Sequence, residues 1–178
     1  MTPQFRAARW WMTLTLSLAT GIASAQEDPC AKFTWDVAQE RALFATAPQV
    51  LAAGHDVASA PQLAPGRLYQ LQLTFDAQVT LALPPSRKPK NAADTSYGGL
   101  AHLSLKLPGN YRVSADQPVW IDIVADGKMI DSADFQGRAG CQAPHKIIQY
   151  SLAAGRELLL QLSGAPSATV RLTITAAG

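Results

Sequence analysis

The sequence contains few residues whose types and spacing match a known catalytic or metal-binding motif. It has no G-x-S-x-G nucleophile elbow, no P-loop or dinucleotide-binding glycine pattern and no H-E-x-x-H zinc motif. The three histidines lie far apart, so a metal site would need ligands from separate strands, for example His102, His145 and Asp122. We therefore expect no cofactor and no catalysis, with a metal-dependent enzyme built on scattered His and Asp residues as the alternative function.

Residues suited to ligand binding are easier to find. Trp120 falls on the polar side of an alternating segment, opposite Val119, Ile121 and Ile123, and Asp122 shares its side. An exposed aromatic ring with hydrogen-bonding neighbours is typical of a surface that binds sugars or peptides. With two further polar-face residues and one tyrosine from a long loop, the candidate ligand-binding residues are Trp120, Asp122, His102, Arg112 and Tyr97.

An alternative interpretation of Trp120 is that its face of the sheet is covered. Large aromatic side chains are mostly buried in folded proteins. An N-terminal helix or a long loop could then lie over the tryptophan, with Trp35 and Phe44 as its packing partners.

The two cysteines, Cys30 and Cys141, predict a disulfide bond and an oxidising compartment. Such a bond would close a loop of about 110 residues, which on the loop-entropy model contributes roughly 4–5 kcal/mol. The alternative is a reactive or metal-binding thiol pair, but no C-x-x-C spacing supports it.

The first 25 residues have the three parts of a secretory signal peptide. Arg6 and Arg9 form a basic region, residues 10–23 form an apolar run, and Ala23, Ser24 and Ala25 form a cleavage site. The run is shorter than the about 20 apolar residues that a spanning helix needs. We therefore expect a periplasmic or secreted chain that begins at residue 26, without stable membrane insertion.

The charge of the exported chain restricts its partners. Cleavage removes two arginines and no acid, so acidic and basic side chains become equal in number. A neutral balance gives no electrostatic reason to expect nucleic acid as a partner. We expect a glycan, a peptide or an envelope protein instead, and the sequence leaves the oligomeric state open.

The elements that would position these residues are strands. From residue 66 onward apolar and polar residues alternate, which indicates half-buried strands. The alternating runs are 69–75, 79–83, 101–107, 111–115, 119–124, 146–152, 158–162 and 170–174. Asp126 and Gly127 predict a tight hairpin turn between two of the strands. The fold class expected is all-β: an antiparallel β-sandwich or jelly roll of eight to nine strands, with one short N-terminal helix at about 37–46.

The chain therefore divides into three expected parts. Residues 1–25 are the leader, and residues 26–65 are an N-terminal segment with the short helix, tied to the core by the disulfide. Residues 66–178 are the β-sandwich. Within it, residues 84–99 form a long loop whose basic cluster at 87–90 could meet an anionic group, although exposed charge runs are usually only solvated.

Two family resemblances support the fold. The runs GNYRV (109–113), LAAGREL (152–158), LSG (162–164) and VRLTI (170–174) resemble bacterial pre-peptidase C-terminal domains, which implies a secreted jelly-roll sandwich over roughly residues 98–178. The runs FTWD (33–36), DQPVWID (116–122) and CQAPHK (141–146) are similar to those of short periplasmic proteins of unknown function. Those proteins are sometimes labelled homogentisate dioxygenases, but this sequence lacks the clustered His-x-His and Glu of a cupin-type iron site.

Overall fold

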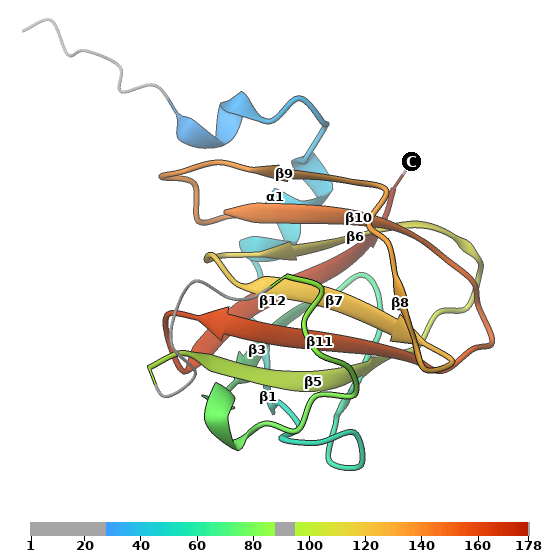
Figure 1. Ribbon diagram of the computed structural model, residues 1–178. Coiled ribbons are helices and arrows are strands. Elements are labelled where there is room, and N and C mark those ends of the chain that lie inside the picture. Colours follow the sequence, from blue (N-terminus) through green and yellow to red (C-terminus); the bar gives the residue numbers. More distant parts are fainter. Residues whose placement is uncertain (1–27, 88–94, 178) are drawn as a thin grey trace, which may run out of the picture.

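The computed structural model describes residues 28–87 and 95–177, which fold into two β-sheets packed face to face (Figure 1). This architecture confirms the expected all-β sandwich with one short helix near its N-terminus. The expected signal peptide, residues 1–25, lies outside the described residues. No helix in the described ranges is long and apolar enough to cross a membrane.

Each sheet has six strands. In spatial order, the first sheet contains β1 (Gln49–Ala52), β3 (Leu68–Gln72), β12 (Thr169–Ala176), β6 (Gly109–Ala115), β10 (Lys146–Leu152) and β9 (Asp134–Gly137). The second sheet contains β2 (Gln62–Leu63), β5 (Tyr97–Leu103), β11 (Leu158–Ala165), β7 (Trp120–Ala125) and β8 (Lys128–Ile130), with β4 (Thr74–Phe75) paired to β5.

Both sheets are mixed, because β1 runs parallel to β3 and β2 runs parallel to β5. The sequence pattern suggested that the sandwich begins at residue 66. In the structure it begins earlier, with β1. The described residues form twelve strands, more than the eight or nine expected. The additional strands have two to four residues each, which is too short for alternation to reveal them.

The core lies between the two sheets and consists of the inward side chains of the alternating runs. Val119, Ile121 and Ile123 are all buried there, as their alternation predicted. The largest fully buried members of this core are Leu63, Leu71, Ile121, Ile123, Leu160, Leu162, Leu172 and Ile174. Each such side chain contributes about 1.5–3 kcal/mol through burial, so the core accounts for much of the stability.

The expected strand at 79–83 does not form. After the short 3-10 helix η2 (Asp76–Gln78), residues 79–87 lie across the outer face of the second sheet, and we name them the covering segment. In Figure 1 this green segment crosses in front of β11 and β7. Val79, Leu81 and Leu83 alternate because one side of the segment packs on a second apolar cluster, formed by Leu100, Val124 and Leu159.

The predicted helix is confirmed as α1 (Ala38–Phe44), which packs on the outer face of the first sheet against β12. The carboxylate of Asp36 accepts a hydrogen bond from the backbone N–H of Ala38 at 2.9 Å and so satisfies one N–H of the first turn. Val37 and Phe44 are buried under the helix. The helix and the covering segment therefore cover opposite outer faces of the sandwich.

Two local predictions are also confirmed. Cys30, in the 3-10 helix η1 (Pro29–Lys32), is disulfide-bonded to Cys141, just before β10. The bond ties the start of the described chain to the first sheet. Asp126 and Gly127 have φ values of 49° and 70° and join β7 to β8 in a tight hairpin, in which Ala125 is paired with Lys128.

Candidate functional site

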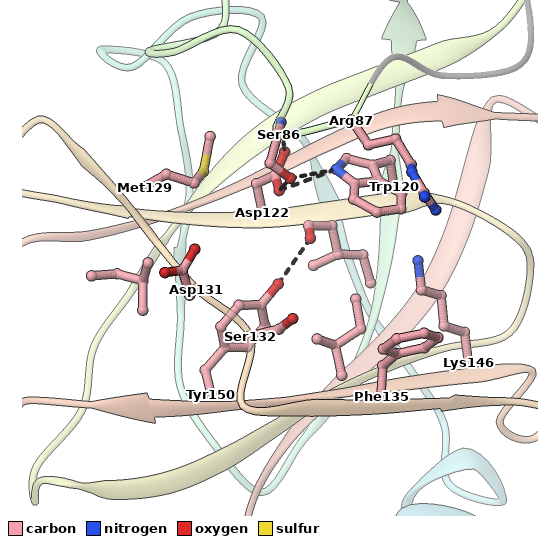
Figure 2. A pocket seen from close by; sticks show the side chains of 13 residues that line it. Ser86, Arg87, Trp120, Asp122, Met129, Asp131, Ser132, Phe135, Lys146 and Tyr150 are labelled. Carbon is pink, nitrogen blue, oxygen red and sulfur yellow. Dashed lines mark hydrogen bonds between the residues drawn. The ribbon is translucent and has the colours of Figure 1, made fainter.

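A cavity of about 210 Å³ opens at one edge of the sandwich, between β7 and β8 of the second sheet and β9 and β10 of the first (Figure 2). It exists because β8 pairs with β7 only along residues 123–125. The chain then crosses to the first sheet and continues as β9. On this side, the described structure gives residues 120–122 of β7 no neighbouring strand, and the space between the sheets stays open.

The floor of the cavity is part of the hydrophobic core. Ile121 reaches it from β7, and Ile148 and Tyr150 reach it from β10. Phe135 of β9 lies opposite Ile148 in the register, so its side chain is on the core-facing side of the sheet. Phe135 is nevertheless 67% exposed to solvent. The exposed Phe135 ring therefore stands at the mouth of the cavity, beside core side chains that are themselves only 1–5% exposed.

Two side chains from β10 reach across to the open edge of β7. The Tyr150 hydroxyl donates a hydrogen bond to the carbonyl of Ile121 at 2.8 Å, and Lys146 Nζ donates to the carbonyl of Val119 at 3.0 Å. Burial raises the pKa of the Tyr150 hydroxyl well above its ordinary range, and the negative charge of Asp122 raises it further. Tyr150 is therefore a neutral donor that satisfies a carbonyl without a strand partner.

Two cations lie near the face of Trp120. Lys146 Nζ is 4.7 Å from the ring centroid, and the Arg87 guanidinium carbon is 5.8 Å from it. Both distances are within the range of cation–π attraction. Burial lowers the pKa of the Lys146 ammonium, and the negative charge of Asp122 opposes this shift. Two cations and the carboxylate of Asp122 thus surround the tryptophan at the rim of the cavity.

Asp122 is buried beside Trp120 and already has three hydrogen bonds. It accepts from the backbone N–H of Ser86 at 3.1 Å, from the Ser86 hydroxyl at 2.5 Å and from Trp120 Nε1 at 3.1 Å. The side-chain amide of Gln161, on the neighbouring strand β11, forms two hydrogen bonds with the backbone of Leu83. It accepts from the N–H of Leu83 at 3.0 Å and donates to its carbonyl at 3.2 Å. These polar contacts fasten the covering segment to the sheet.

Trp120 is half-buried, so the interpretation that its face is covered is the one that the structure supports. The cover is the covering segment, whose residues 84–87 belong to the expected long loop, and not the N-terminal helix. The expected packing partners are wrong. Trp35 packs on Arg112, with 4.7 Å between the guanidinium carbon and the ring centroid, and Phe44 lies near Arg171; both positions are on the outer face of the first sheet.

Of the five candidate ligand-binding residues, the structure brings only Trp120 and Asp122 together. Arg112 lies on β6 in the other sheet, under α1. Its Nη1 donates to the carbonyl of Asp36 at 2.9 Å and lies 3.6 Å from the buried carboxylate of Glu40. This arginine therefore holds the helix and is not part of a surface with Trp120.

His102 and Tyr97 both lie on β5, which β11 separates from β7. The His102 ring contacts the carbonyl of Val57 at 3.1 Å, and the Tyr97 ring stacks on Phe75 at a centroid distance of 4.6 Å. The sequence predicted one surface formed by all five residues. The structure corrects this prediction, because the five residues are distributed over both sheets.

The structure does not bring together His102, His145 and Asp122, the residues of the alternative metal site. Within residues 28–87 and 95–177, no three His, Cys, Asp or Glu side chains are grouped so that they could hold a metal ion. His102 is on β5, His145 precedes β10 in the other sheet, and the carboxylate of Asp122 is bound to Ser86.

Sequence reasoning did not select Lys146, Arg87, Phe135 or Tyr150 as site residues. Lys146 begins an alternating run and Tyr150 lies within it, which are ordinary positions for a rim and a core residue. The basic cluster at 87–90 was the one signal that pointed to an anionic group, and Arg87 belongs to it.

No protein-family model and no curated protein sequence matches this chain. The resemblances to pre-peptidase C-terminal domains and to short periplasmic proteins therefore stay predictions.

Proposed function

We propose that this protein is an exported, non-catalytic β-sandwich domain that binds a peptide, or an extended segment of an envelope protein, in the cavity beside Trp120. The observation that carries the proposal is the cavity between the two sheets, which has an apolar floor and the exposed ring of Phe135 at its mouth. Concave sites with an apolar floor and a few polar groups at the rim are typical of ligand binding. At about 210 Å³ the cavity is smaller than the about 300–1,000 Å³ of drug-sized sites, so it suits one side chain.

The state of Asp122 favours a peptide over a glycan. A sugar platform needs a free carboxylate beside the aromatic ring to bind hydroxyl groups, and Asp122 is buried and bound to Ser86 and Trp120. Two cations also lie near the ring of Trp120. An apolar floor between isoleucines stabilises a hydrophobic side chain more than a hydroxylated ring.

The same contacts favour binding over catalysis. A general base needs a titratable group that is free to take a proton from the substrate. Asp122 accepts three hydrogen bonds from the protein, and the neutral Tyr150 hydroxyl donates to the carbonyl of Ile121. Asp122 and Tyr150 therefore have structural tasks at this site.

The proposed location is the periplasm or the extracellular space. The Cys30–Cys141 disulfide supports an oxidising compartment outside the cytoplasm. The signal peptide expected at residues 1–25 and the balanced charge of the exported chain agree with it.

Tryptophan fluorescence tests the proposal. The four tryptophans are Trp10, Trp11, Trp35 and Trp120, and the first two belong to the expected leader. In protein exported to a bacterial periplasm, Trp35→Phe therefore leaves Trp120 as the single emitter. We expect a saturable change in its emission with N-acetyl-glycylglycylphenylalanine, as the free acid or the amide, and none with chitotetraose. A response to the sugar alone, or to neither ligand, would contradict peptide binding here.

A matched pair of variants locates the binding. Phe135 and Leu107 are both highly exposed, and Leu107 lies outside the cavity. Phe135→Ala removes a wall of the cavity and should weaken peptide binding by about five- to thirtyfold, the equivalent of roughly 1–2 kcal/mol of lost apolar contact. Leu107→Ala should leave the affinity unchanged. Equal effects of the two changes would place the binding elsewhere.

A further inference from the structure

Lys146 and Arg87 are two cations at the Trp120 ring, and the negative charge of Asp122 acts on Lys146. Within residues 28–87 and 95–177, neither forms an ion pair of 4.0 Å or less with a carboxylate. The contacts that Lys146 makes are with a backbone carbonyl and the Trp120 ring, and those of Arg87 are with that ring. Lys146 is partly buried and no carboxylate contacts it within those residues, so an arriving anion would relieve part of the cost of its desolvation.

The cations and the apolar floor lie side by side. Figure 2 shows Lys146, Arg87 and Trp120 at one end of the cavity, with Phe135 next to Lys146. Asp131 and Met129 lie at the opposite end, so the negative charge of Asp131 is on the far side from Lys146. A group bound at this site would meet two cations and a hydrophobic surface at the same time, while the carboxylate of Asp122 is held by Ser86 and the Trp120 indole.

We propose that the cavity recognises the C-terminal residue of a peptide, with its apolar side chain on the floor formed by Ile121 and Ile148 and its terminal carboxylate between Lys146 and Arg87. This inference rests on the proposed peptide-binding function and names the part of the peptide that is bound. A C-terminal residue carries a carboxylate and a side chain on the same Cα, which matches a cavity the size of one side chain. Capture of a terminal carboxylate is an established mode of peptide recognition.

An internal acidic side chain fits less well. Its carboxylate lies at the tip of its own side chain, so the apolar group would have to come from a neighbouring residue. The peptide would also have to continue past the cavity in both directions, across the covering segment and β9. A chain terminus enters the cavity from one side and avoids both conditions.

A comparison of an acid with its amide tests the inference. In the Trp35→Phe protein, N-acetyl-glycylglycylphenylalanine with a free carboxylate should bind at least tenfold more tightly than its C-terminal amide, since the amide lacks the charge. If both bind equally, recognition of the terminus is wrong while peptide binding stands. If neither changes the emission of Trp120, both proposals fail. If 3-phenylpropionate binds as tightly as the tripeptide acid, the ligand is a small hydrophobic carboxylate and the peptide assignment is overturned.

Variants of the two cations complete the test. Lys146→Met keeps the length of the side chain and should abolish the preference for the acid, whereas Lys128→Met, at an exposed position of β8, should retain it. Arg87 is exposed, so Arg87→Gln carries little risk for folding, and it should reduce the preference at least threefold. Arg67→Gln, also exposed, is its control. An unchanged preference in both cavity variants would overturn the inference.

Discussion

Asp122 and Ser86, which are 36 residues apart in the chain, share two hydrogen bonds, of 2.5 Å to the serine hydroxyl and 3.1 Å to its backbone N–H. This contact attaches the end of the covering segment to the second sheet at the point where Trp120 stands. The same carboxylate also holds the indole N–H at 3.1 Å. One side chain therefore contributes both to the orientation of the tryptophan and to the position of the covering segment.

Asp122→Asn should loosen the covering segment. The amide weakens three hydrogen bonds to a buried group, which should lower the free energy of unfolding by about 1–3 kcal/mol in urea titrations. Trypsin should then cleave after Arg87 faster than in the unchanged protein. Asp131→Asn, at an exposed position of the same cavity, is the control and should have an effect within about 0.5 kcal/mol. Equal stability and cleavage rates in the two variants would contradict the role of Asp122.

Tyr150→Phe should change the dependence of stability on alkaline pH. Since the pKa of Tyr150 is raised in the folded protein, its contribution to stability is fully present below the ordinary value of 10.0. It is lost as the pH rises from there toward the folded pKa, because the unfolded chain releases the proton first. The variant should lose about 1–3 kcal/mol at neutral pH, with the carbonyl of Ile121 left unpaired, and should show a smaller alkaline decline. Urea titrations at about pH 8 and pH 11 measure both, and parallel declines would refute this assignment.

Reduction of the Cys30–Cys141 disulfide should destabilise the fold strongly. The bonded residues are 111 positions apart, so on the loop-entropy model its loss should cost about 4–5 kcal/mol. Thermal melts with and without a reductant, and of Cys30→Ser with Cys141→Ser, should show the same large decrease in Tm. An unchanged Tm would mean that the N-terminal segment contributes little to the stability of the sandwich.

Glu40→Ala should lower the stability of the fold, because Glu40 belongs to a buried polar network under α1. Glu40 is 1% exposed, and its Oε1 accepts a hydrogen bond from the Thr175 hydroxyl at 2.7 Å and lies 3.6 Å from Arg112. Removal of one partner of a buried ion pair costs about 3–5 kcal/mol. We expect a loss of that order for Glu40→Ala and little change for the exposed control Glu157→Ala.

Arg112→Met should decrease stability in the same way but leave peptide binding at Trp120 unchanged, because the arginine lies on the other sheet. Calorimetric melts and the fluorescence titration measure these two properties independently. If Arg112→Met abolished peptide binding without lowering the melting temperature, Arg112 would belong to the ligand site after all.

The sequence was sufficient to predict the parts of the fold that local physics determines. Alternation located β6, β7, β10, β11 and β12, because each has one side in the core between the sheets. Asp126 and Gly127 marked the β7–β8 hairpin, since both tolerate positive φ. The pair of cysteines predicted the disulfide because two thiols in an exported chain have few other partners.

The candidate site was mostly beyond such reasoning. Val79, Leu81 and Leu83 alternate like a strand, but alternation reports only that one side of a segment is buried. Whether that side joins a sheet edge or lies on a sheet face depends on contacts with distant residues. The importance of Lys146 likewise depends on the open edge of β7, which the early departure of β8 creates. A single aromatic such as Phe135, between two polar neighbours, has no pattern that reveals it.

The place of β12 in the first sheet has a consequence for the order of assembly. This strand ends at Ala176, close to the end of the chain, yet it lies between β3 and β6 and pairs with both. Until it arrives, β1 and β3 are joined to the rest of their sheet by no ladder of hydrogen bonds. A chain that folds as it emerges from its N-terminus would thus complete its first sheet only after every other described strand had emerged.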